Sequence, residues 1–455
     1  MSLQDEEASL LRGTAGDSVV VSKKRWRYLV AGQVFFAISA VALAIALGVV
    51  VSQQPGQGDG GGDEEIPPPG PVPSVPKLPF RSPAFYDIDT AHSLPVQFTT
   101  TWSTWANLDV SPDGQWMVFD HLGDIYRVSL SDPGAVATPL RRGVAFDLQP
   151  RFSPDGNSIL FKSDLSGCDN LWVMTRDGEN ARQLTAEEFR FVGSAAWAPS
   201  GQQVVGVKWH TTSRSIPAGE LWLFNVTSEG TTGGAQLVGR ASDTAQIGPE
   251  EPVFDPAGQY VYYSQNVADG GSQTFEYSKD PHAGIYSIRR VNVATGKVET
   301  VTGGAGGACR PQLSRNGKLL AFVRRIRFES ALVLRDLETG NERVLYSGLS
   351  TDQQESSASH GVYPTFNWLA DDSAIVIWSK GQFFRIDATT GVETSIPVTV
   401  NVDLKLAPTA MANVDASTGE TVIPKVLQWA DLNADRTVAY VTAAGHVYST
   451  GFLVY

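Results

Sequence analysis

The chain has very few of the residues that build disulfide frameworks and metal sites. It contains two cysteines, Cys168 and Cys309, among 455 residues. Two cysteines so far apart fit neither a disulfide framework nor a local zinc site, so we interpret them as separate small residues, with a mutual bridge as the less favoured alternative. The six histidines are scattered, and no two are close enough in sequence to form a metal-binding pair. We therefore predict no metal site and no cofactor.

Familiar catalytic motifs are missing as well. The sequence has no Gly-x-Ser-x-Gly elbow, no phosphate-binding P-loop and no His-Glu-x-x-His pair. Its formal net charge is −13, and no basic face is discernible beyond the first thirty residues, which argues against a nucleic-acid partner. The sequence therefore favours a chain without catalytic activity of its own.

One long apolar run is present, the 24 residues of Tyr28–Val51. It is long enough to cross the hydrocarbon core of a bilayer as a transmembrane helix. Basic residues precede the run and acidic residues follow it, so the positive-inside rule places residues 1–27 in the cytosol. This predicts a single-pass type II signal-anchor with the rest of the chain extracellular or in an endomembrane lumen; a cleaved signal peptide is the alternative. Ala40, Ala44 and Gly48 recur every fourth residue, a spacing that would allow a homodimer through this helix.

Residues 52–79 are first Gly-rich and then Pro-rich. Such a composition cannot form a packed core, so we expect a flexible, disordered stalk. The remainder, residues 80–455, is the expected globular domain. It carries one N-glycosylation sequon at Asn225, which fits a location outside the cytosol.

The globular region repeats one unit, and the clearest copy is Phe146–Thr185. Its turn, Ser153-Pro154-Asp155-Gly156, lies between two short apolar stretches that are typical of half-buried strands. Related turns recur with a strand of aromatic or large aliphatic residues at a similar distance after each; they begin at Ser111, Ser153, Ala198, Asp255, Ser314, Leu369 and Asn433. Seven four-stranded units predict an all-β, seven-bladed β-propeller, with six blades as the alternative because the last two turns are degenerate.

A propeller ring often closes with a strand from the other end of the chain. The C-terminal unit has three predicted strands, and one further strand is predicted at Leu94–Trp102. We expect that strand to complete the C-terminal unit.

The repeats resemble a known family. The turn Ser153–Gly156 followed by Asn170–Thr185 resembles the WD40-like repeats of TolB-type propellers. Cys309–Arg325 and Asp336–Tyr346 resemble more narrowly the propeller that precedes the catalytic domain of some amidohydrolase-family proteins. The resemblance covers about Phe98 to Tyr448 and implies the fold. It implies no catalytic residue, because the metal ligands of that family lie in a domain outside the propeller.

Candidate site residues lie just before or on the innermost strands, where side chains of a propeller point toward its central channel. The predicted channel-mouth residues are Asp147, Gln149, Arg151, Glu250, Arg310 and Tyr363. They either pair with one another and serve only the fold, or bind a polar ligand or peptide. Longer connections at 211–219, 264–284 and 350–361 offer further places for binding or are neutral insertions.

The sequence supports two alternative hypotheses for the function. The first is a membrane-anchored, non-catalytic propeller that binds a protein or peptide outside the cytosol. The alternative is the N-terminal part of a larger amidohydrolase-like or dipeptidyl-peptidase-like hydrolase, since in both families the catalytic domain follows the propeller.

Overall fold

The computed structural model describes residues 93–451, except 133, 213–215, 268–283, 357, 407–425, 444 and 445. The predicted transmembrane segment Tyr28–Val51 and the predicted stalk lie outside these residues. Nowhere in the described ranges is there a helix long and apolar enough to cross a membrane. The chain divides into two compact units, one of Lys77–Thr409 and one of Met1–Pro76 with Ala410–Tyr455, and each is described by itself.

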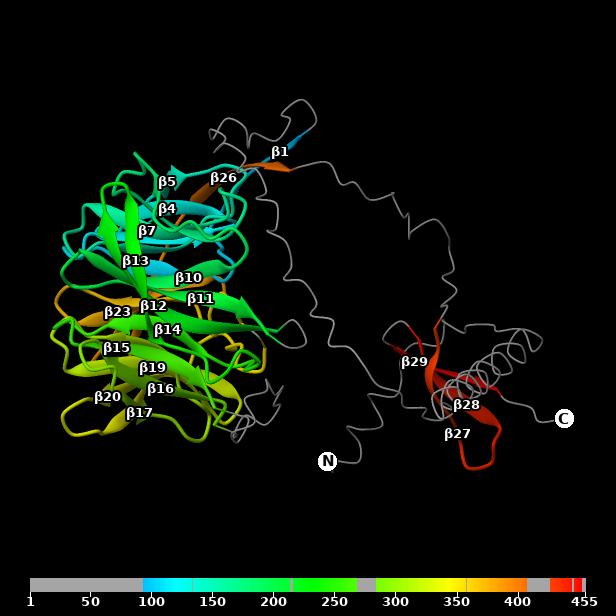
Figure 1. The fold of residues 1–455 in the computed structure, drawn as a ribbon. Helices are drawn as coiled ribbons and strands as arrows, with labels where there is room; N and C mark the ends of the chain where they lie inside the picture. Colours follow the sequence, from blue (N-terminus) through cyan, green and yellow to red (C-terminus); the bar gives the residue numbers. More distant parts are fainter. Residues whose placement is uncertain are drawn as a thin grey trace, which may run out of the picture. The chain divides into compact units, whose positions relative to one another are not determined.

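The larger unit contains six four-stranded antiparallel sheets that follow one another along the chain (Figure 1). Their strands are β2–β5 (Leu108–Val110, Trp116–His121, Asp124–Ser129, Thr138–Arg141), β6–β9 (Leu148–Phe152, Ser158–Ser163, Asn170–Thr175, Arg182–Gln183), β10–β13 (Phe191–Trp197, Gln203–Thr211, Pro217–Thr227, Gly230–Val238), β14–β17 (Pro249–Phe254, Tyr260–Asn266, Tyr286–Asn292, Val298–Thr302), β18–β21 (Cys309–Leu313, Leu319–Ile326, Glu329–Asp336, Glu342–Tyr346) and β22–β25 (Asn367–Trp368, Ala374–Ser379, Gln382–Asp387, Glu393–Ile396).

The six sheets form a closed ring. The first strands of successive sheets contact one another, and β2 of the first sheet contacts β22 of the sixth. At this junction the amide of Leu108 donates a hydrogen bond to the carbonyl oxygen of Thr365 over 3.2 Å. Meandering sheets whose first strands surround an axis are the architecture of a β-propeller. The predicted all-β propeller fold is therefore confirmed.

The turn after each first strand forms as the sequence predicts. In the second sheet, the amide of Gly156 donates to the carbonyl oxygen of Ser153, and the Ser153 hydroxyl accepts a hydrogen bond from the Ser158 amide. Gly156 has a φ of 71°, in the left-handed region that glycine adopts without strain. The degenerate sixth turn keeps this geometry, since Asp372 takes the same place with a φ of 59°.

The predicted pairing of the N-terminal strand is wrong. Strand β1 (Leu94–Thr100) pairs antiparallel with β26 (Val400–Leu406), not with the C-terminal unit. These two segments directly precede the first sheet and follow the sixth, so ring closure brings them together and gives β1 a nearby partner.

The expected seventh unit is not one of the six sheets of the ring. Its strands β27 (Gln428–Leu432), β28 (Val438–Ala443) and β29 (His446–Gly451) form a three-stranded sheet in the other compact unit. Its first strand is still built like those of the ring, because Trp429 has a φ of 53° at a shift in register.

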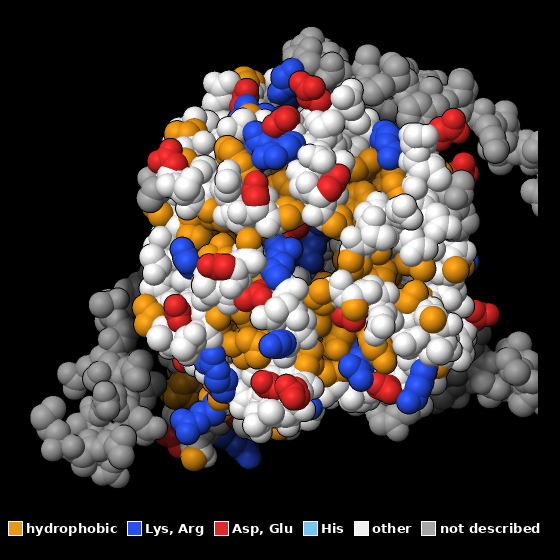
Figure 2. Space-filling view, turned by 90° about the vertical axis from the view of Figure 1, so that its left-hand side faces the viewer, with side chains coloured by type: hydrophobic (Ala, Val, Ile, Leu, Met, Phe, Trp, Pro, Cys, Tyr) orange, Lys and Arg blue, Asp and Glu red, His pale blue; other side chains and the backbone are white. Residues whose placement is uncertain are grey.

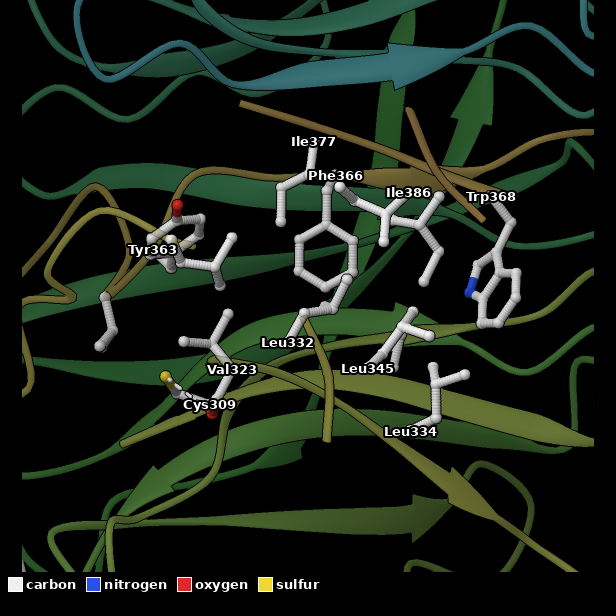
Figure 3. Close-up of a cluster of buried hydrophobic side chains, with 14 of the residues drawn as sticks. Cys309, Val323, Leu332, Leu334, Leu345, Tyr363, Phe366, Trp368, Ile377 and Ile386 are labelled. Carbon is white, nitrogen blue, oxygen red and sulfur yellow. Dashed lines mark hydrogen bonds between the residues drawn. The ribbon is translucent and has the colours of Figure 1, made fainter. Parts of the chain in front are cut away.

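Apolar side chains fill the spaces between neighbouring sheets. The largest cluster lies between the fifth and sixth sheets, where Leu332 and Leu334 of β20 pack with Phe366, Trp368 and Ile377 (Figure 3). Every one of these side chains is almost completely buried. Cys309 is part of this cluster and Cys168 is only partly buried, and both are free thiols, so the two cysteines are separate as interpreted from the sequence.

Candidate functional site

A β-bulge directs polar side chains toward the axis in four of the sheets. The register between the first and second strands shifts at the same place in sheets two to five. At each shift one residue has a positive φ: Gln149, Ser194, Glu251 and Arg310. Bulges of this kind re-aim side chains and recur near binding sites. These four side chains line one small cavity of about 10 Å³ together with Thr365. We call them, with Asn107 at the equivalent position of the first sheet, the deep ring.

Two residues further along each first strand lies a second set of side chains, which we call the outer ring. Its members are Asp109, Arg151, Ala196, Val253, Gln312 and Asn367. All six line a larger cavity of about 250 Å³, which also borders the turns at Pro112, Pro154, Pro199 and Pro256. This cavity, the axial pocket, therefore opens on the face that carries the turns. Figure 2 looks onto that face and shows Lys and Arg side chains around a central hollow.

Arg151 is the central cation of the axial pocket. Its side chain is nearly fully buried, and its Nη2 donates to Oε1 of Gln312 over 3.1 Å. Its Nη1 lies 3.9 Å from Oδ1 of Asp109 and has no hydrogen-bond partner among the described residues. Burial lowers the pKa of Arg151, and the neighbouring Arg310 and Arg315 lower it further, while Asp109 acts in the opposite direction.

The carboxylate of Asp109 makes its hydrogen bonds with groups other than Arg151. Its Oδ1 accepts hydrogen bonds from the Val110 amide and the Asn367 side chain, and its Oδ2 accepts one from the Phe152 amide. The carboxylate thus joins the first, second and sixth sheets at the axis. It neutralises Arg151 only partly, because its lone pairs are directed at three other donors.

Glu251 joins neighbouring sheets in the deep ring, as Asp109 does in the outer ring. The residue is 2 % exposed. Its Oε2 accepts from the Ser264 hydroxyl and the Arg310 amide, each at 2.6 Å, and its Oε1 lies 3.0 Å from Nη2 of Arg310. The same Oε1 accepts the amide of Val362 over 2.6 Å. Glu251 therefore connects the fourth sheet to the fifth and to the segment that leads into the sixth.

The described residues of that segment, 349–356 and 358–362, cover the end of the axis opposite the turns, and we call them the strap. The His360 carbonyl oxygen accepts a hydrogen bond from Nε2 of Gln149 in the second sheet over 2.8 Å. Further along the strap, Asp352 pairs with Arg325 of the fifth sheet at 2.7 Å. Because the strap makes hydrogen bonds with Gln149 and Glu251 of the deep ring, it covers the inner end of the axial pocket, whose outer end opens at the turns.

The six predicted site residues divide into two groups. Gln149, Arg151 and Arg310 all line the small cavity of the deep ring. Asp147, Glu250 and Tyr363 line neither cavity.

The three residues that do not line the axis have other partners. Asp147 pairs with Arg141 at 2.7 Å, and the Tyr363 hydroxyl donates to the carbonyl oxygen of Trp378 inside the apolar core. Glu250 is buried near the Tyr286 hydroxyl, and its pKa is raised well above its usual value by burial and by the adjacent Glu251.

Further axial residues were not predicted as site residues: Asp109, Asn367 and Arg315. Aligning the copies from the turn backwards would have found the first two, because the outer ring always lies two residues before the turn begins. Arg315 occupies a turn position that is Pro in the four preceding copies, and that exchange is its only signal in the sequence. The sequon residue Asn225 is exposed on β12, where its side chain accepts a hydrogen bond from Gln203.

The titration of Asp120 makes the stability of this buried polar network depend on pH. Its carboxylate accepts hydrogen bonds from the amides of Asn107 and Gln149, yet burial dominates and raises its pKa to about 6. A raised carboxyl pKa contributes stability that is complete below the unfolded value of 3.8 and is lost as the pH rises through about 6. We expect this contribution to fall by about 3 kcal/mol between pH 4 and pH 7.

The measurement is urea unfolding of the wild type and of Asp120→Asn at a series of pH values. The variant cannot titrate at this position, whereas every histidine and other carboxyl group is common to both proteins and cancels in the difference. The wild type should lose stability relative to the variant as the pH rises. A difference that stays constant with pH would show that Asp120 is ionised throughout.

No group of three or more His, Cys, Asp or Glu side chains that could hold a metal ion occurs in the described part of the chain. The fold and the axial pocket define the chain as a β-propeller protein with a polar pocket on its axis.

Comparison with known proteins bears on the fold alone. No protein-family model matches the sequence. An uncharacterised protein of Agrobacterium fabrum is 29% identical over 145 residues, which are 29% of this chain and 45% of that protein, so the chain spans less than half of the relative.

Solved structures similar to this chain include TolB of Agrobacterium tumefaciens, with 18% identity, a TM-score of 0.44 and coverage of 67% of this chain and 91% of that one. TolB of Acinetobacter baumannii is 13% identical, with a TM-score of 0.45 and 65% of each chain covered. A puromycin-hydrolysing peptidase of Mycobacterium tuberculosis is 15% identical, with a TM-score of 0.42 and coverage of 77% of this chain and 50% of that one. The predicted TolB-type resemblance is thus confirmed, and at these identities it concerns the fold alone.

Proposed function

We propose that this chain is a non-catalytic binding module, a six-bladed propeller that receives a segment of a protein or peptide in its axial pocket. The observation that carries the proposal is the pocket itself, about 250 Å³ in volume, which is lined by the outer ring and bordered by the turns. Its polar wall can fix the orientation of a ligand, and its proline-rich rim offers apolar contact.

The hydroxyl groups in this pocket support binding rather than catalysis. Ser153 donates to Asp155 and Ser314 donates to Asn316, so each hydroxyl serves its own turn. None of the described residues that line the pocket is a histidine. A serine nucleophile needs a base that is free to take its proton, and both hydroxyl groups are already bound within their own turns.

From the sequence alone we further propose a type II membrane anchor at Tyr28–Val51, which would place the propeller outside the cytosol. The alternative role as the propeller of a larger hydrolase stays a prediction. In that case the axial pocket would control the access of substrate to the catalytic domain.

Blocking the axial pocket tests the binding function. Ala196 is a small residue that lines the cavity and also packs in a buried apolar cluster, and Ala196→Trp is designed to narrow the cavity. Peptides selected from a displayed random library on the wild-type full chain should lose at least about tenfold in affinity for this variant, the loss expected when a hot-spot pocket is closed. The readout is fluorescence anisotropy of each selected peptide.

The matched control is Val298→Trp, which introduces the same side chain at an exposed position of β17 that does not line the pocket. Both variants are first shown to keep the wild-type unfolding midpoint. If the selected peptides bound Ala196→Trp as well as the control, the axial pocket would not be the binding site.

A further inference from the structure

We propose that the axial pocket binds a carboxylate group, held by the guanidinium groups of Arg151 and Arg315. This inference rests on the proposed binding function and names the chemistry of its ligand.

Arg151 has a hydrogen-bond donor that the rest of the described chain leaves unused. Arg151 lines the pocket and is only 8 % exposed, and its buried Nη1 has no hydrogen-bond partner in the described residues. A buried charged donor without a partner costs free energy, and such groups are normally satisfied in native proteins. The closest carboxylate oxygen, Oδ1 of Asp109, lies 3.9 Å away and accepts two other hydrogen bonds. An incoming anion would complete the coordination of this guanidinium.

Arg315 provides a second cation at the same pocket. Its Nη2 donates to the carbonyl oxygens of Val110 at 3.1 Å and Trp368 at 3.5 Å, and its buried Nε has no partner in the described part of the chain. These carbonyl contacts hold the guanidinium between the first and sixth sheets but do not neutralise it. Two guanidinium groups with unused donors therefore line one cavity.

The geometry favours a carboxylate over a more highly charged anion. The planar donor fork of arginine matches the two oxygens of a carboxylate. Two acidic side chains, Asp109 and Asp255, also line the pocket. They balance the formal charge of Arg151 and Arg315, so a single negative charge is attracted by the unused donors, whereas a dianion would be repelled by the two carboxylates.

The closed inner end limits how the carboxylate is presented. The deep ring leaves a cavity of only about 10 Å³, and the strap lies behind it. A polypeptide therefore cannot thread through the axis. The carboxylate must enter from the turn face as the last group of a chain or side chain, which means either the C-terminus of a peptide or an Asp or Glu side chain.

The test uses three small probes on the wild-type full chain, measured by saturation-transfer NMR at millimolar concentration. N-acetyl-glycylglycine carries a terminal carboxylate, and N-acetylglutamate α-amide carries a side-chain carboxylate. N-acetyl-glycylglycine amide carries none. We expect one or both carboxylates to bind and the neutral amide to bind at least about tenfold more weakly, as for loss of a charge-assisted hydrogen bond. The carboxylate probe that binds shows whether the ligand group is the C-terminus of a peptide or an acidic side chain.

Variants then locate the site. Arg315→Gln and Arg151→Gln should each weaken binding of the carboxylate probe by about tenfold or more. Lys318→Gln removes an exposed positive charge from the same turn, does not line the pocket and should change nothing. Arg315 is only partly buried, so its variant keeps the test available if Arg151→Gln does not fold.

Two results would overturn the inference: neither carboxylate probe binds, or binding is equal in Arg315→Gln and in the wild type. Equal binding of the neutral amide would also overturn it. None of these results would remove the proposed function, which fails only if library-selected peptides are indifferent to Ala196→Trp.

Discussion

Replacing Glu251 with alanine is expected to destabilise the larger unit by roughly 3–5 kcal/mol, the cost of breaking a buried ion pair on one side. The substitution leaves Arg310 buried with its carboxylate partner removed. It also removes the acceptor of three donors, the Ser264 hydroxyl and the amides of Arg310 and Val362. Urea unfolding followed by far-UV circular dichroism measures the effect.

The matched control is Glu299→Ala. Glu299 pairs with Lys297 and Arg290 at the outer edge of the fourth sheet, where solvent screens the charges, so its loss should move the midpoint little. A second readout is local. Because Glu251 holds Val362, limited proteolysis should cut the strap faster in Glu251→Ala than in Glu299→Ala. Equal stability of the two variants would mean that the deep ring does not hold the sheets together.

The repeat pattern predicted the fold because it is encoded locally. The turn chemistry of Ser153–Gly156 and the following apolar strand depend on neighbouring residues, and each copy repeats both. The same reasoning could not count the sheets of the ring. Asn433–Arg436 forms a turn like the others, and β27–β29 form a sheet, yet that sheet belongs to the other compact unit. Membership in a ring depends on contacts between sheets, and no local signal encodes it.

The site was predicted only in part for a related reason. The sequence identifies the innermost strand, and so it found Gln149, Arg151 and Arg310. It does not show which of two adjacent residues a bulge turns toward the axis. Glu250 and Glu251 are neighbours, and the bulge sends Glu251 to the deep ring while Glu250 faces Tyr286. A shift of one residue at a bulge therefore decides between an axial residue and a core residue.

The sequence shows a long connection at 350–361, which contains most of the strap. It does not show that this connection covers the inner end of the axial pocket. Its contacts with the deep ring are made through backbone groups, the carbonyl of His360 and the amide of Val362, which leave no signature in side-chain type. The closed inner end of the pocket, which limits a ligand to a terminal group, could thus be recognised only in the structure.

Trp368→Ala is expected to cost roughly 3–5 kcal/mol, the usual range for truncating a fully buried tryptophan. Trp368 is 0 % exposed and packs with Leu334 and Ile386 in the cluster of Figure 3. Its indole nitrogen donates to the carbonyl oxygen of Gln312 over 3.2 Å. The control is Trp102→Ala, since Trp102 is 61 % exposed and should contribute much less.

The same residue joins the core to the axial pocket. Its indole holds the backbone of Gln312, whose side chain contacts Arg151, and its own carbonyl oxygen accepts from Arg315. Trp368→Phe keeps most of the volume and the carbonyl but loses the indole donor, so it should cost less stability than alanine and still weaken binding of the carboxylate probe. Wild-type affinity in Trp368→Phe would mean that packing alone positions the two arginines, whereas a weakened affinity at nearly unchanged stability would show that the indole hydrogen bond sets the geometry of the pocket.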